Sequence, residues 1–235
     1  MLLPSGRMAF ADLRKQSIKI CKTDSHKEFE LNTGFRVNDL FYNKEDGTIL
    51  VLLGVGVFFV NSFISILHVA QRTMRRKIPC GQSRTSGLTV HNGTVVFCSN
   101  EGIHKIRLID GVTTTLLTEN NCGNSRVAVF KEKLYYTKNN SVSCCDVQCN
   151  THWVFENKRV LNSPCGITVD NDGFVFVAGH GSHNVVVISQ DGKHFKEILN
   201  KDDGLCHPKA LHFDYEMMRL LVGNTKNKVF LFCLN

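Results

Sequence analysis

The sequence has few of the features that separate domains. It contains 4 prolines in 235 residues, and no proline-rich linker, low-complexity tract or block of one charge interrupts it. Nothing therefore marks a domain boundary, and the length suits one propeller or sandwich rather than two large domains. With 43% hydrophobic and 21% charged residues, the composition is that of a folded domain and argues against wholesale disorder.

Signatures of catalysis and of secretion are also missing. The chain has no Ser/His/Asp set, P-loop or dinucleotide-binding fingerprint, so we expect no catalytic residues and no cofactor. Its N-terminus lacks the basic-then-apolar pattern of a signal peptide. Four of the ten cysteines fall within expected strands, where a free thiol behaves as a small hydrophobe: Cys21, Cys98, Cys144 and Cys233. A reducing compartment is therefore favoured, and we expect a cytoplasmic protein.

What the chain does contain is a repeated β-meander, clearest in residues 166–199. Four short apolar runs lie there, at 166–169, 174–178, 185–189 and 195–199. The spacers between them combine glycine with Asn, Asp or Ser, which supply the positive φ angles of tight hairpin turns. Four strands joined by three hairpins have about the length of one β-propeller blade, whose strands we call a, b, c and d.

The first run of this meander recurs along the chain. Its counterparts end at residues 90, 129, 169 and 213, in steps of 39, 40 and 44, and a looser copy occupies residues 39–42. This spacing predicts an all-β, six-bladed propeller forming a single domain over residues 1–235. The expected blades are approximately 7–32, 37–79, 86–119, 126–156, 166–199 and 210–234. Of these the first lacks most of strand a and the last lacks strand d, so we expect the chain to be an N-terminally shortened part of a longer protein.

Residues 49–70 support a competing interpretation. They form a nearly unbroken apolar run followed by Arg72, Arg75, Arg76 and Lys77, a pattern typical of a transmembrane helix with a positive flank. Their β-branched and aromatic content, and their fit to the repeat, favour two buried strands instead. A single-pass membrane protein remains the alternative.

The repeat resembles a known family. The segments CGITVDNDGFVFVAG and NVVVISQDGKHFKEIL are similar to the NHL-repeat propellers of tripartite-motif (RING, B-box and coiled-coil) proteins. The resemblance implies a recognition platform for a protein partner or single-stranded RNA, the targeting half of a ubiquitin-ligase scaffold. Ligase activity in that family belongs to the RING, whose paired zinc ligands this sequence lacks. An enzymatic role would therefore require a RING upstream.

Basic residues recur in the loops expected at one face of such a propeller. The net charge of +7 and pI near 8.9 favour anionic partners. A ring of cations with aromatic rings nearby would attract phosphates and stack on bases, although solvated loop residues are the plainer interpretation. The expected basic rim comprises Arg36, Arg84, Arg126 and Lys209 in the d–a loops, and Arg14, Lys15, His180, His183, Lys226 and Lys228 in the b–c loops. Phe35 and His207 are the stacking candidates.

Two further chemistries are disfavoured. Cys144, Cys145, Cys149 and His152 have a spacing that suggests zinc, but adjacent residues of a strand point to opposite faces, so we expect no metal site there. A calcium-dependent propeller hydrolase would need carboxylates converging on one centre, whereas Asp170 and Asp214 fall on the a–b side as turn residues. The sequence does not specify the partner, the RNA motif or the oligomeric state.

Overall fold

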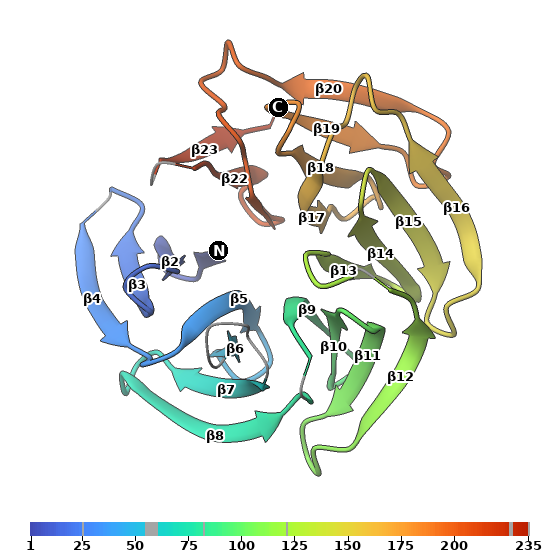
Figure 1. The fold of residues 1–235 in the computed structure, drawn as a ribbon. Helices are drawn as coiled ribbons and strands as arrows, with labels where there is room; N and C mark the ends of the chain where they lie inside the picture. Colours follow the sequence, from blue (N-terminus) through green and yellow to red (C-terminus); the bar gives the residue numbers. More distant parts are fainter. Residues whose placement is uncertain (25, 55–60, 82, 121, 226–227, 235) are drawn as a thin grey trace. The chain divides into compact units, whose positions relative to one another are not determined.

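The computed structural model describes residues 1–24, 26–54, 61–81, 83–120, 122–225 and 228–234. Over these residues the regular structure consists of 23 β-strands, with no helix (Figure 1). The described strands form six antiparallel sheets in which neighbours along the chain pair with each other. This is the six-bladed β-propeller fold that the repeat predicts. The chain divides into two compact units, Met1–Asn124 and Ser125–Asn235.

Unit 1 contains three four-stranded blades, with strand orders β1-β2-β3-β4, β5-β6-β7-β8 and β12-β11-β10-β9 (Figure 1). The strands are β1 (Leu2–Leu3), β2 (Arg7–Asp12), β3 (Ser17–Lys22), β4 (Lys27–Asn32), β5 (Arg36–Asn43), β6 (Thr48–Gly54), β7 (Ser62–His68), β8 (Thr73–Pro79), β9 (Thr85–His91), β10 (Thr94–Ser99), β11 (Gly102–Arg107) and β12 (Thr113–Thr118).

Unit 2 contains two four-stranded blades, β13-β14-β15-β16 and β17-β18-β19-β20, and a last sheet with the described strands β21-β22-β23. The strands are β13 (Val127–Phe130), β14 (Lys133–Lys138), β15 (Ser141–Asp146), β16 (Thr151–Glu156), β17 (Pro164–Val169), β18 (Val175–Gly179), β19 (Asn184–Ile188), β20 (Phe195–Leu199), β21 (Ala210–Asp214), β22 (Arg219–Gly223) and β23 (Val229–Cys233).

The first blade corrects one detail of the expected strand count. Its strand a is present as the two-residue β1, which pairs with β2 through Leu2 opposite Met8. Leu2 and Leu3 are both buried, so two side chains suffice to fix this short strand against its neighbour. The blade therefore has four strands, whereas the last sheet has three described strands, as expected.

The apolar run at residues 49–70 supplies two strands, β6 and β7, and its residues 55–60 lie outside the described part of the chain. Every residue of β6 is buried. Its alternate side chains serve two cores: Ile49 and Val51 pack with residues of the first blade, and Leu50 and Leu52 with those of the third. Strands buried on both faces read as continuous apolar runs.

The described part of the run therefore does not form the transmembrane helix of the alternative interpretation. Residues 48–54 and 62–68 are strands, so a helix over this segment is wrong. In the portion of the chain that the structure describes, no helix is long and apolar enough to cross a membrane.

The outermost strand of each blade differs from the inner ones in exposure and in pairing. Strand β12, for example, exposes Thr113, Thr114 and Thr115, whereas β10 is almost wholly buried. In all five blades with a described strand d, the register shifts by a β-bulge between strands c and d. A bulge increases local twist and makes an exposed edge a poorer template for pairing with another chain.

Two glycines with similar backbone angles, Gly192 in unit 2 and Gly93 in unit 1, test how closely the surroundings of Gly192 are packed. Gly192 has φ +74°, and a Cβ there would lie 2.5 Å from the ring of Trp153, whose indole N–H donates to the Gln190 carbonyl at 3.0 Å. Gly93 has φ +69° with nothing within 4 Å of its Cβ position. We expect Gly93→Ala to cost about 1–2 kcal/mol of unfolding free energy, from the left-handed backbone alone.

Gly192→Ala should cost about 1–3 kcal/mol more, because it adds an overpacked contact to the same backbone strain. It should also shift the emission of Trp153, the single tryptophan. Urea unfolding of both variants, followed by fluorescence and circular dichroism, measures the difference. Equal urea midpoints for the two variants would show that the Trp153 ring can move aside without loss of stability.

Candidate binding site

In unit 1 the b–c turn of the first blade is tied to the loop that enters the second. The backbone N–H groups of Arg14 and Lys15 donate to the Asp12 carboxylate at 3.1 and 3.0 Å. The carbonyl of Gln16 then accepts the N–H of Thr33 at 2.8 Å. Two of the expected rim residues therefore lie in a turn that is fixed to the segment carrying Phe35.

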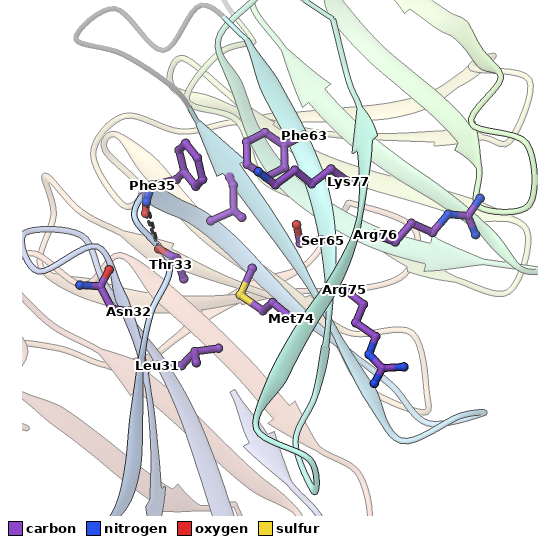
Figure 2. Close-up of a pocket in the computed structure, with 11 residues that line it drawn as sticks. Leu31, Asn32, Thr33, Phe35, Phe63, Ser65, Met74, Arg75, Arg76 and Lys77 are labelled. Carbon is purple, nitrogen blue, oxygen red and sulfur yellow. Dashed lines mark hydrogen bonds between the residues drawn. The ribbon is translucent and has the colours of Figure 1, made fainter.

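Phe35 lines a cavity of about 220 Å³ between the first two blades (Figure 2). Its ring meets that of Phe63 edge-on, with 5.1 Å between the centroids. The ammonium of Lys77 lies 5.0 Å from the Phe35 centroid and 5.1 Å from that of Phe63, within cation–π range. The described lining residues are Leu31, Asn32, Thr33, Phe35, Leu53, Phe63, Ser65, Met74, Arg75, Arg76 and Lys77.

Three successive cations on β8 border this cavity, and all three are exposed. A bulge places Lys77 opposite Ser65 and Arg75 opposite Ile66, so that Arg76 is the extra residue, with φ 57°. Arg76 donates to the carbonyl of Ile109 at 2.9 Å, whereas Lys77 reaches toward the aromatic rings (Figure 2). Sequence reasoning missed these side chains as candidates for binding, because their position after an apolar run resembles a membrane flank.

Arg36 and Arg84, the other rim residues expected in unit 1, are not among the described residues that line this cavity. Arg36 is the first residue of β5, and Arg84 donates to the Asn124 side-chain oxygen at 2.7 Å. In unit 2, Lys228 is exposed just before β23, and Lys226 lies outside the described residues.

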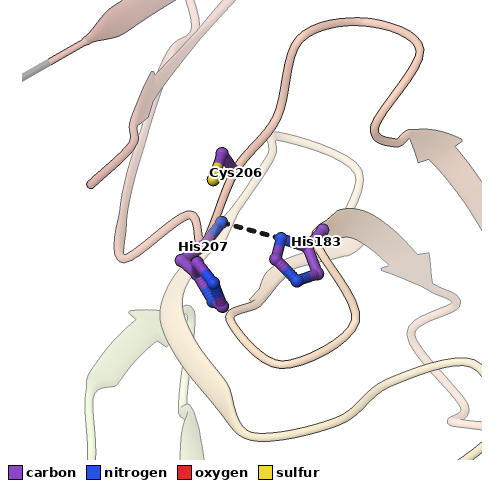
Figure 3. A group of neighbouring side chains, drawn as sticks. All are labelled: His183, Cys206 and His207. Carbon is purple, nitrogen blue, oxygen red and sulfur yellow. Dashed lines mark hydrogen bonds between the residues drawn. The ribbon is translucent and has the colours of Figure 1, made fainter. Parts of the chain in front are cut away.

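Three histidines of unit 2, which come from two loops, lie next to one another. His180 and His183 belong to the β18–β19 turn, and His207 to the loop between β20 and β21. Ring centroids are 4.8 Å apart for His180 and His207, and 4.0 Å apart for His183 and His207. The His207 backbone N–H donates to Nδ1 of His183 at 3.1 Å (Figure 3). Thus His207 is enclosed by two imidazoles instead of presenting an isolated stacking surface.

Electrostatics reduce the charge of this cluster. Desolvation, followed by the nearby charge of Lys209, lowers the pKa of His180 below its ordinary value of 6.5. Desolvation, followed by His207 and Lys201, lowers the pKa of His183 in the same way. Both rings are therefore mostly neutral at pH 7, and they add hydrogen-bonding and aromatic surface to the rim rather than positive charge.

The remaining cations of this rim, Arg126 and Lys209, lie near Cys165. Burial raises the pKa of the Cys165 thiol, and the two cations partly oppose that rise. The Arg126 backbone N–H donates to the Thr137 hydroxyl at 3.0 Å, which is 3.2 Å from the carbonyl of Cys165. Two of the d–a loop cations predicted from the sequence thus act on the same thiol.

The Cys144–His152 segment shows the expected opposition of adjacent strand residues. Cys144 pairs across the sheet with Tyr135 and belongs to the buried core. The Cys145 thiol instead hydrogen-bonds to Cys149, which raises the pKa of Cys145 and lowers that of Cys149. Cys144 and Cys145 therefore lie on opposite faces of the strand, in different surroundings.

No protein-family model and no curated protein matches the sequence. Solved structures with a similar fold include an inactive variant of virginiamycin B lyase from Staphylococcus aureus, determined with quinupristin (17% identity, TM-score 0.67, covering 99% of this chain and 82% of the lyase). A luciferin-regenerating enzyme is also similar (14% identity, TM-score 0.72, 95% and 81% coverage). So is an auxiliary nutrient binding protein from Bacteroides ovatus (13% identity, TM-score 0.77, 99% and 68% coverage). At these identities the likeness shows the propeller fold alone, and a fold does not assign a function.

The histidine environments yield a pH prediction. Ring signals of His180 and His183, followed by NMR, should titrate with midpoints below 6.5. Lys209→Gln should raise the midpoint of His180 with little effect on His183, because it removes a positive charge near His180. Lys201→Gln should likewise raise the midpoint of His183 with little effect on His180. Parallel shifts in both rings would contradict this assignment.

The lowered pKa values of His180 and His183 also make the stability of the fold depend on pH. Because both folded-state pKa values lie below that of the unfolded chain, the unfolded state binds more protons under mildly acidic conditions. The contribution of these rings to stability is complete above pH 6.5 and falls as the pH drops toward the folded-state pKa values.

Proposed function

We propose that this propeller is a non-catalytic recognition module that binds single-stranded RNA at the Phe35 cavity and its basic border. The observation that carries the proposal is the combination of two aromatic rings with the Lys77 ammonium and two flanking arginines. Proteins that bind single strands combine cationic grooves for phosphates with aromatic side chains for bases.

The size of the cavity favours insertion of a single group. Its volume of about 220 Å³ lies below the range of about 300–1,000 Å³ that holds drug-sized ligands. One base can enter while the phosphates remain outside, where Arg75 and Lys77 are exposed. An acidic protein surface would use the same cations but would gain little from Phe35 and Phe63.

The resemblance of residues 166–199 to NHL repeats supports a finer proposal. The chain would be the target-recognition part of a tripartite-motif-like ubiquitin-ligase protein, acting in the cytoplasm. In this proposal the partner enters through the propeller and any ligase chemistry belongs to another part of the protein.

Binding to labelled oligo(U), measured by fluorescence anisotropy at several salt concentrations, tests the proposal. Arg75→Glu/Lys77→Glu should weaken binding and reduce the slope of log K against log[salt] by about 1.4, since each phosphate contact to a single strand contributes about 0.7. Phe35→Ala should cost about 1–3 kcal/mol, the range for loss of one stacked base, with an almost unchanged slope. Lys44→Glu/Lys105→Glu is the charge-matched control, as both residues are exposed and outside the cavity.

Other outcomes identify other partners or sites. Weakening by Arg84→Glu/Arg126→Glu, with none from the Arg75 and Lys77 pair, would place binding on the rim expected from the sequence. The RNA proposal would be refuted, in favour of an acidic protein partner, by two results together. Polyglutamate would displace the labelled oligo(U) as well as unlabelled oligo(U) does, and Phe35→Ala would leave the affinity unchanged.

A further inference from the structure

Unit 2 holds a cluster of soft and borderline metal ligands that the RNA proposal does not use. One nitrogen from each of His183 and His207 and the sulfur of Cys206 all lie within 4.8 Å of one another (Figure 3). All three side chains are half-buried, which leaves them partly shielded and still open to an entering ion. We propose that His183, Cys206 and His207 form a binding site for Zn²⁺.

Hydrogen bonding already orients His207 as a ligand. Its Nδ1 is 3.0 Å from the carbonyl oxygen of His180, which can only accept, so Nδ1 carries the proton. Nε2 is then the nitrogen with the free lone pair. Histidines that bind metals commonly donate the other ring N–H to a backbone carbonyl in this way.

His183 is held by a complementary contact. Its Nδ1 accepts the His207 backbone N–H at 3.1 Å, so this nitrogen carries a lone pair. An ion bound at Nδ1 would replace that hydrogen bond with a coordinate bond. The exchange sacrifices one hydrogen bond, whose net contribution to stability is modest.

The loop that supplies Cys206 and His207 is anchored by the two residues that follow β22. The Thr225 hydroxyl donates to the Cys206 carbonyl at 3.0 Å, and the Asn224 amide donates to the Gly204 carbonyl at 3.1 Å. Leu205 is buried directly before the ligand pair. Supported loops of this kind hold ligands near a usable geometry without bound metal.

The ligand types select the metal. Two imidazoles and a thiolate suit zinc and its borderline relatives, whereas calcium and magnesium require oxygen ligands, of which these three residues offer none. Three protein ligands leave one tetrahedral position for water or for a group from a partner. The site is chemically distinct from the Cys145–Cys149 pair, whose two thiols hydrogen-bond to each other.

Cobalt titration of the full, reduced chain tests the site, because Co²⁺ replaces Zn²⁺ and reports its ligands by colour. We expect one equivalent to bind, with thiolate-to-cobalt charge-transfer absorption that Zn²⁺ then bleaches. Cys206→Ser should remove the charge-transfer absorption. His183→Asn should weaken binding about tenfold or more, comparable to or larger than losses seen when support of a ligand is removed.

The variants separate loss of metal from loss of fold. His183 has φ 62°, and asparagine tolerates the left-handed region, so His183→Asn should still unfold cooperatively in urea, with a midpoint lowered only by the loss of the contacts to His207. Cys149→Ser and Cys233→Ser are matched controls that should leave the absorption and affinity unchanged. Failure of Co²⁺ to bind, persistence of the charge-transfer band in Cys206→Ser, or its loss in Cys149→Ser would each overturn the proposal.

Discussion

Burial of the middle strands on both faces is the constraint on which the rest of the structure depends. A four-stranded meander that exposed Ile49 and Val51 on one side and Leu50 and Leu52 on the other could not stand alone in water. Each blade therefore needs packed neighbours, and the hydrophobic gain comes from cores shared between successive sheets. The same constraint explains why β6 is apolar at every position, whereas an outer strand such as β12 carries a run of threonines.

Because the strands are committed to packing, recognition chemistry falls to the loops and the outer strands. Side-chain amides help to fix the connections between strands and blades by donating to backbone carbonyls of neighbouring segments. The Asn38 amide donates to the Thr85 carbonyl at 3.1 Å, and the Asn184 amide donates to that of Val160 at 2.7 Å. Loops fixed in this way can present side chains in defined positions on a rigid support.

Sequence reasoning anticipated those parts of the molecule whose signal is local. Hairpin residues and alternating apolar runs place β20 at residues 195–199, and the recurrence of such runs identifies the propeller. The Lys77 contact was missed because it depends on Phe35, which lies 42 positions earlier, in the loop that precedes β5. The histidine cluster was missed as a metal site for the same reason: His183 and His207 are far apart in sequence and meet only because consecutive blades place their loops side by side. Local patterns specify strands, but convergence of side chains is a property of blade packing.

The two candidate sites differ in the kind of interaction that they can offer. Around Phe35, exposed cations stand beside aromatic rings, the arrangement that the proposed binding of a charged single strand requires. Around His207, the rings are fixed by hydrogen bonds at 3.0 and 3.1 Å and are directed at one another rather than outward. Side chains that converge on a point suit a small ligand with strict geometric demands, whereas side chains arrayed along an edge suit an extended one. This difference in arrangement suits the two proposed sites to different kinds of ligand.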